Sequence, residues 1–196
     1  APLRATRLNG PAPTPDGVML PGEWDAATHL HLPLAFLTNT PQRGALDLWL
    51  TASPGATDRL LVAAQISGVQ STAGETLWLW FGGGDVKSLS ASAGWLDWHW
   101  ANGSLALDSA QNGRGAVGQA NGALIFELGM PLAPPDGDDV QLTPLHDSLL
   151  AVAFSQSFTD TFGAARVAAG AWPADFYLGQ WEKLGRLALT PAVSGD

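Results

Sequence analysis

Residues 75–81 read ETLWLWF and run directly into the turn residues GGGD at 82–85. Successive side chains of an extended strand point to opposite faces, so Trp78 and Trp80 share one face while Leu and Phe side chains occupy the other. Both faces of this strand are therefore apolar. A strand of this kind is either central and covered on both sides, or it exposes a binding patch on one of them.

Similar short segments, rich in aliphatic or aromatic residues and bounded by turn residues, continue on both sides of this strand. They are residues 28–34, 46–51, 59–66, 95–100, 122–128, 149–155 and 185–190. Asn-Gly pairs at 102–103 and 121–122, NGRG at 112–115 and PPDGDD at 134–139 supply turn chemistry between them. A helical period is not sustained for three turns, and only residues 163–172 are expected to form a short helix or a loop. The sequence predicts an all-β fold, a single β-sandwich of the immunoglobulin-like or jelly-roll type.

Length and composition narrow the class of protein. The chain has 196 residues, of which 46% are hydrophobic and 14% charged, and its formal net charge is −9. These values exclude a disordered chain and disfavour a nucleic-acid binder, which needs a basic face. No apolar run is long enough to cross a membrane as a helix. We expect residues 1–15 to form a Pro-rich arm or linker and residues 16–196 to form one domain.

The chain contains no Cys, so any metal must be held by His, carboxylate or Met side chains. We expect an exported protein, periplasmic or at the cell surface, in its mature form without a signal peptide. The small first residue, the Pro-rich start and the acidic, lysine-poor composition favour that location. An envelope protein complex or a cell-surface glycan is the expected partner, whereas nucleic acid is not.

Several blocks, in order, resemble family-nine carbohydrate-binding modules and their DOMON-like relatives. They are DGVMLPGEWDAA at 16–27, RLLVAAQISG at 59–68, ETLWLWF at 75–81, NGALIFELGMPL at 121–132 and WEKLGRLALT at 181–190. The resemblance spans most of residues 16–190. It implies a β-sandwich and an extracytoplasmic setting, but no single ligand, because relatives of this fold bind sugars, bind haem b or serve as envelope modules.

A histidine pair is the first candidate site. His29 and His31 are two positions apart, so in a strand they project from the same face. Imidazole nitrogen without thiolate suits Cu(II). The His-Leu-His pattern also resembles the copper ligands of copper superoxide dismutases, which implies two further His, here His99 and His146. It would imply a redox-active oxidoreductase, with an Arg such as Arg43 guiding the anion. The alternative is a pair of solvated histidines on an edge strand.

The tryptophans are the second candidate. Trp78 and Trp80 share one strand face, and Trp98 and Trp100 share another, with His99 turned the opposite way. Exposed aromatic faces can stack on sugar rings, so this set indicates a non-catalytic carbohydrate-binding module, with Asp97, Asn102 and Glu75 as candidate polar partners. The alternative is that these rings fill a sandwich core.

Two other cofactors are weaker expectations. Met130 and Met19 are the available thioether ligands for haem b, although neither lies in a haem-ligand motif. The carboxylates of residues 136–139 can bind calcium, although their spacing is not that of an EF-hand. A further alternative is that the protein is a structural subunit of an envelope complex.

Overall fold

The computed structural model describes residues 2–8, 10–36, 44–53, 59–69, 74–159, 165–174, 176 and 180–189. The side chains of residues 34–36, 157–159 and 165–169 are outside this description. Within the described residues the regular structure is almost entirely β, as the sequence predicts, with one short 3₁₀ turn.

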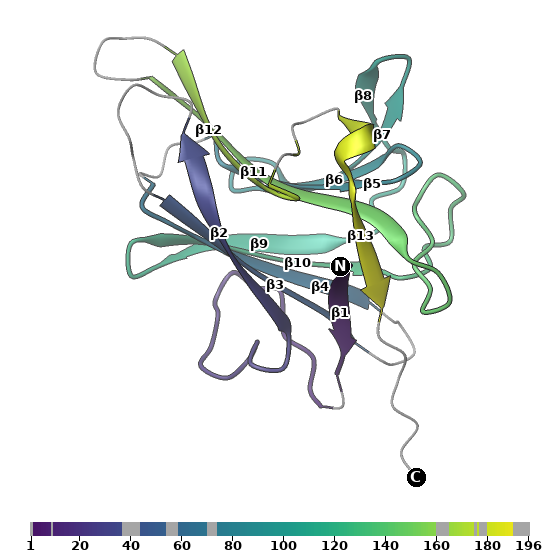
Figure 1. The fold of residues 1–196 in the computed structure, drawn as a ribbon, viewed down its shortest axis with the longest axis horizontal. Coiled ribbons are helices and arrows are strands. Elements are labelled where there is room, and N and C mark those ends of the chain that lie inside the picture. Colours follow the sequence, from purple (N-terminus) through teal and green to yellow (C-terminus); the bar gives the residue numbers. More distant parts are fainter. Residues whose placement is uncertain are drawn as a thin grey trace.

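The strands form two sheets, which Figure 1 shows as two layers. The first sheet has the order β8-β7-β6-β5-β11-β12, and the second has the order β2-β3-β4-β10-β9. The bounds of these elements are β2 Thr28–Phe36, β3 Gly44–Ser53, β4 Arg59–Ser67, β5 Thr76–Phe81, β6 Asp85–Ser90, β7 Gly94–Ala101, β8 Ser104–Leu107, β9 Arg114–Ala120, β10 Ala123–Pro131, β11 Ser148–Thr159 and β12 Ala165–Trp172. The 3₁₀ turn η1, Trp181–Lys183, precedes the last strand, β13, Gly185–Leu189.

The two sheets are joined at one corner by β2. Thr28–Leu34 of this strand pair with β3 in the second sheet, and Ala35 and Phe36 pair with β12 in the first. A second connection comes from β1, Leu3–Arg7, which pairs in parallel with β13 and then with β3. Part of the segment expected to be a free arm is therefore a strand that links the two layers.

Alternating apolar side chains fill the space between the sheets. Leu46, Leu48 and Leu50 of β3 and Leu77, Leu79 and Phe81 of β5 belong to one continuous core, and all six are fully buried. Because each strand contributes every second residue to this core, the remaining side chains form the outer faces. The strand expected at 75–81 is central in its sheet, since β5 lies between β6 and β11.

The local turn chemistry is mostly as expected. Asn102-Gly103 and Asn121-Gly122 have positive φ at both residues and connect β7 to β8 and β9 to β10. This is the geometry of the type I′ hairpin turn, which matches the twist of the flanking strands. The helix or loop expected at 163–172 is wrong over 165–172, because these residues form β12 and pair with β11. The turn expected at 112–115 is also displaced, since β9 begins at Arg114.

The outer face of the second sheet is partly covered by the segment that precedes β2. Trp24 packs against Leu61 and Ala63 of β4, and its indole nitrogen donates to Glu127 Oε1 on β10 at 2.8 Å. The backbone N–H groups of Gly17 and Val18 donate to the other oxygen of Glu127 at 2.8 and 3.1 Å. One buried carboxylate thus fixes this segment to the sheet.

Candidate functional site

The outer face of the first sheet carries the four tryptophans that the alternation singled out. Trp78 and Trp80 project from β5, and Trp98 and Trp100 project from β7, all on the side opposite the main core. Val86 of β6, the strand between them, and Ala153 of β11, on the other side of β5, belong to the same apolar cluster. We call these four side chains the tryptophan face. The structure thus brings together both predicted pairs, although β6 separates their strands.

Trp80 is the centre of this face and only 2% of it is exposed. Its ring centroid lies 5.8 Å from that of Trp100 and 5.0 Å from that of Trp181 in η1, with tilted ring planes. Phe176 packs on it at 6.0 Å. Such tilted arrangements at 4.5–7 Å are the favourable geometry for aromatic pairs. Trp80 is therefore a core residue of this face, whereas Trp78, Trp98, Trp100 and Trp181 remain partly exposed.

Hydrogen bonds hold two of the exposed rings in place. The indole N–H of Trp78 donates to Ser155 Oγ on β11 at 3.0 Å, and that of Trp98 donates to Ser88 Oγ on β6 at 2.8 Å. Each bond spans two strands, so each ring is fixed in its orientation on the sheet. A fixed, half-exposed ring can receive a ligand without loss of its own conformational entropy.

Sequence reasoning missed the contribution of the C-terminal segment to this face. Phe176 and Trp181 precede β13 and lie outside any strand, so strand alternation gives no information about where they point. The signal available in the sequence was the concentration of aromatic residues in 172–181.

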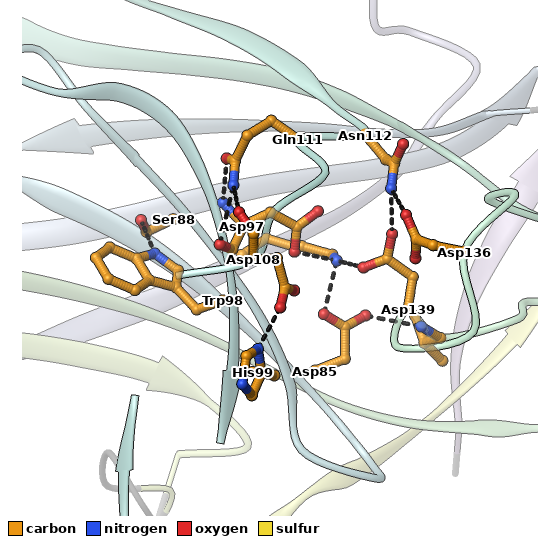
Figure 2. Close-up of polar contacts among 12 residues, drawn as sticks. Asp85, Ser88, Asp97, Trp98, His99, Asp108, Gln111, Asn112, Asp136 and Asp139 are labelled. Carbon is orange, nitrogen blue, oxygen red and sulfur yellow. Dashed lines mark hydrogen bonds and ion pairs between the residues drawn. The ribbon is translucent and has the colours of Figure 1, made fainter. Parts of the chain in front are cut away.

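The inner side of the same strands carries a buried ionic cluster, shown in Figure 2. The ammonium of Lys87 on β6 contacts Asp85 at 2.6 Å and also contacts Asp97 on β7 and Asp139 in the 132–147 loop. Lys87 is 1% exposed and Asp97 is fully buried. We call these four residues the Lys87 cluster. Asp97 therefore lies on the opposite side of the sheet from the tryptophan face, and the prediction that it assists sugar binding there is wrong.

Burial and the contacts with Lys87 act in opposite directions on the pKa values of the three aspartates of this cluster. Desolvation raises the pKa of Asp97 to about 7, although the hydrogen bond and charge of Lys87 oppose the rise. Desolvation also raises the pKa of Asp85. Burial lowers the pKa of Lys87, but the charge of Asp85 and the hydrogen bonds of Lys87 to the three carboxylates outweigh burial, so the pKa of Lys87 is raised. Hydrogen bonds from Lys87 and Asn112 outweigh burial at Asp139 and lower its pKa. The negative charge of the three aspartates is therefore neutralised partly by the ammonium of Lys87 and partly by a proton on Asp97.

Further polar groups extend the cluster toward the surface. His99 on β7 contacts Asp108 through Nδ1, and Asn112 donates to Asp136 and to Asp139. Oxygens of Asp85, Asp97, Asp108 and Asp139 lie within 4.8 Å of one another. The calcium expectation for residues 136–139 stays a prediction. An ion bound at these oxygens would have to displace the ammonium of Lys87, which contacts three of the four carboxylates.

The histidine pair lies on the other sheet. His29 and His31 project from β2, and both rings contact the same atom, Oδ1 of Asp47 on β3, at 2.9 and 2.8 Å. The ring of His29 stacks on Trp49 with a centroid distance of 4.6 Å and an interplanar angle of 8°. The two histidines thus project from one face, as predicted, and cross-strand pairing adds Asp47, which the sequence did not indicate and which both rings contact.

The other nominated ligands lie elsewhere. His99 is engaged with Asp108 beside the Lys87 cluster, and His146 is exposed in a turn paired with Thr143. Among the described residues no three histidines come close enough to share an ion. Met130 is 1% exposed within the main core, and Met19 packs beside Trp24. Arg43 lies outside the described residues.

Two solved structures have a similar fold. One is a carbohydrate binding module of family 9 from Caldicellulosiruptor kristjanssonii in complex with cellotriose. It has a TM-score of 0.60 and 11% identity, over 99% of this chain and 96% of its own. The other, described as such a module in complex with glucose, has a TM-score of 0.52 and 12% identity over 98% of both chains. No family profile and no curated protein matches the sequence.

At these identities the likeness shows the fold. The chain is a β-sandwich like that of the family-9 carbohydrate-binding modules, as the sequence blocks implied. The resemblance to DOMON-like proteins stays a prediction.

Proposed function

We propose that this protein is a non-catalytic carbohydrate-binding module and that the tryptophan face is its sugar-binding surface. The observation that carries the proposal is the group of partly exposed indole rings on β5, β7 and η1, packed around the buried ring of Trp80. The similar fold of two sugar-bound modules supports it.

The physical basis is stacking between a sugar ring and an indole. The C–H groups on a sugar face pack against the electron-rich face of an aromatic ring, while polar side chains at the edge bind the hydroxyls. Ser88 and Ser155 already hold the rings of Trp98 and Trp78, so little ordering is required on binding. Glucose and cellotriose are the first ligands to test, because they are bound in the structurally similar modules.

Isothermal titration calorimetry with glucose, cellotriose and a panel of other trisaccharides tests this proposal. Trp100→Ala and Trp181→Ala should each weaken binding about tenfold or more, because each removes one wall of the aromatic group. Trp49→Ala is the matched control, since Trp49 lies on the other sheet and its loss should leave the affinity unchanged.

Trp100→Phe keeps an aromatic ring at this position. It therefore shows whether a loss of affinity in Trp100→Ala comes from loss of the ring or from a folding defect. It should retain more affinity than Trp100→Ala, with a near-UV circular dichroism spectrum close to that of the parent. Absence of binding to every saccharide tested would exclude the proposal. Equal losses in Trp49→Ala and Trp181→Ala would place the site away from the tryptophan face.

The proposed partner is therefore a glycan, at the cell surface or outside the cell. No helix among the described residues is long and apolar enough to span a membrane. The expected periplasmic or cell-surface location, docking to an envelope complex, haem b binding and dismutase-type activity all stay predictions.

A further inference from the structure

Two leucines extend the tryptophan face toward the outer edge of the first sheet. Leu107 on β8 is the direct cross-strand partner of Trp98 on β7, and Leu105 is in the same way the partner of Trp100. Directly paired side chains project from the same face of a sheet, so these four form one group, which we call the hairpin patch. Figure 1 shows the β7–β8 hairpin beside η1, whose Trp181 packs on Trp100.

Sugar stacking does not account for the leucines of this patch. An indole ring attracts the C–H groups of a sugar through its electron-rich face, and an aliphatic side chain has no such face. Packing within the fold accounts for Leu105, which lies in the cluster around Trp80, but it leaves 53% of Leu107 exposed. An exposed aliphatic side chain beside aromatic rings is suited to an apolar group on the ligand.

The outward face of the neighbouring strands carries no charge. Every residue of β5–β8 is described, and the ionisable side chains of these strands lie on the side opposite the tryptophans; they are Asp85, Lys87, Asp97 and His99. The outward side chains are those of Trp, Leu, Val, Ser and Thr. A carboxylate or sulfate group on a sugar would therefore meet no cation on these strands, and the net charge of −9 would repel it. We expect the ligand to be uncharged.

We propose that the hairpin patch binds the acetyl group of an uncharged, acetylated glycan. The sugar rings stack on the tryptophan face, and the acetyl methyl group packs against Leu107. An acetyl group adds one methyl group to a sugar without adding charge, and N-acetyl and O-acetyl groups share this chemistry. The inference rests on the proposed function, and it adds the substituent by which the same site selects its glycan.

Matched pairs of ligands test the inference by isothermal titration calorimetry with the full chain. Chitotriose carries an N-acetyl group in place of one hydroxyl on each ring of cellotriose. Acetylated xylotriose is compared with the same sugar after alkaline deacetylation. Because burial of one methyl group is equivalent to about fourfold in affinity, the acetylated member of at least one pair should bind about fourfold more tightly or better. The pair that shows the preference identifies whether the acetyl group is attached through nitrogen or through oxygen.

Variants assign the preference to the hairpin patch. Leu107→Ser should reduce the ratio of the two affinities to near unity, because a hydroxyl offers the methyl group no apolar surface. Leu107→Met keeps an apolar side chain and should keep most of the preference. Leu145→Ser is the matched control, since Leu145 is an 83% exposed leucine in a separate turn and its loss should not change the ratio. Leu107 is exposed on the last strand of its sheet, and near-UV circular dichroism verifies that the fold is preserved.

Equal affinities within both pairs, or tighter binding of the unacetylated sugars, would overturn the inference and leave the proposed function standing. A ratio that Leu107→Ser leaves unchanged would also overturn it, because a fall of both affinities by the same factor would show that Leu107 only supports the rings. Absence of binding to every trisaccharide would overturn the proposed function together with the inference. The two failures are therefore distinguishable.

Discussion

Glu127 illustrates how one side chain can organise a long segment. It projects from the outer face of β10, where a solvated carboxylate would be ordinary, yet it is fully buried. Its two oxygens accept three hydrogen bonds from the segment before β2, at Gly17, Val18 and Trp24. Desolvation raises the pKa of Glu127, and the hydrogen bonds from Trp24 and Gly17 oppose this rise. The carboxylate thus stays buried because the segment satisfies it.

Glu127→Gln should destabilise the protein by roughly 2–4 kcal/mol. The amide has one acceptor oxygen instead of two, so its NH₂ group must face at least one of the N–H donors of Gly17, Val18 or Trp24. Urea denaturation measures the loss in free energy of unfolding. Hydrogen exchange should also become faster in residues 14–24 than in the core strands. An unchanged exchange rate there would show that Glu127 does not hold this segment, and Glu182→Gln, at an exposed position, serves as the control.

Some individual residues of the site can be predicted from the sequence and others cannot. Alternation alone placed His29 with His31 and Trp78 with Trp80, because neighbours on one strand need no tertiary information. Asp47 and the Lys87 cluster could not be predicted, since their members come together only through strand pairing and a loop. The assignment of Asp97 to the tryptophan face was wrong for a different reason, because it overlooked the alternation itself. In a strand Asp97 shares the face of His99, opposite Trp98 and Trp100, and its side chain points inward to Lys87.

At the level of elements, the strands rich in bulky apolar residues were predicted. The strands richer in small or polar residues, namely β1, β6, β8, β9 and β12, were not. Residues 114–120, RGAVGQA, form β9 although two glycines weaken any β propensity. The structure explains both, because a Cβ on Gly115 would lie 2.7 Å from the carbonyl oxygen of Glu127. A Cβ on Gly118 would lie 2.1 Å from the carbonyl oxygen of Gly17, so this position requires glycine where the covering segment crosses the strand. Close approach of two backbones is a tertiary requirement that local propensity does not contain.

Element β12 was missed for a similar reason. Its residues 165–172, ARVAAGAW, are rich in alanine, which favours helix when considered alone. Pairing with β11 along the whole strand, and with β2 at Ala168 and Ala169, overrides that preference. The turns were predictable because their chemistry is local. An Asn-Gly pair adopts the hairpin geometry almost independently of its surroundings.

Gly122→Ala should destabilise the β9–β10 hairpin by about 1–2 kcal/mol, because an alanine in the left-handed region places its Cβ against the following carbonyl. Gly122 has a φ of 78°, and no atom lies within 4 Å of the added Cβ, so backbone strain is the only cost. Gly137→Ala is the matched control, since its Cβ also meets nothing and its φ is not in that region. Denaturant midpoints compare the two variants, and equal midpoints would contradict the type I′ assignment.

At the scale of the whole molecule, the two outer faces of the sandwich differ in their chemistry. The tryptophan face lies outside the first sheet, and His29, His31 and Asp47 lie outside the second. Between the sheets, an aliphatic core gives way to the Lys87 cluster near β6 and β7. The Lys87 cluster affects the stability of the whole fold. When a buried group of a cooperatively unfolding protein changes its protonation, the free energy of unfolding of the entire protein changes.

The stability of the whole protein should therefore decrease as pH rises from about 5 to about 7.5. The folded pKa of Asp97 is about 7, above its ordinary value of 3.8. Between these values the folded chain holds a proton that the unfolded chain has released, so the free energy of unfolding falls with rising pH. The fall should be roughly 2–3 kcal/mol, from about 1.4 kcal/mol for each pKa unit. The raised pKa values of Asp85 and Glu127 act in the same direction.

Urea titrations at several pH values measure this slope, and Asp97→Asn tests its origin. An amide keeps an oxygen for Lys87 but binds no proton in this range, so the variant should lose most of the slope. Its stability relative to the parent should therefore improve as pH rises, since the cost of the buried charge is removed only where Asp97 would be ionised. A parent protein that becomes more stable between about pH 5 and about pH 7.5 would contradict the proton-sharing account of the Lys87 cluster. A slope that Asp97→Asn leaves unchanged would assign the proton to another group.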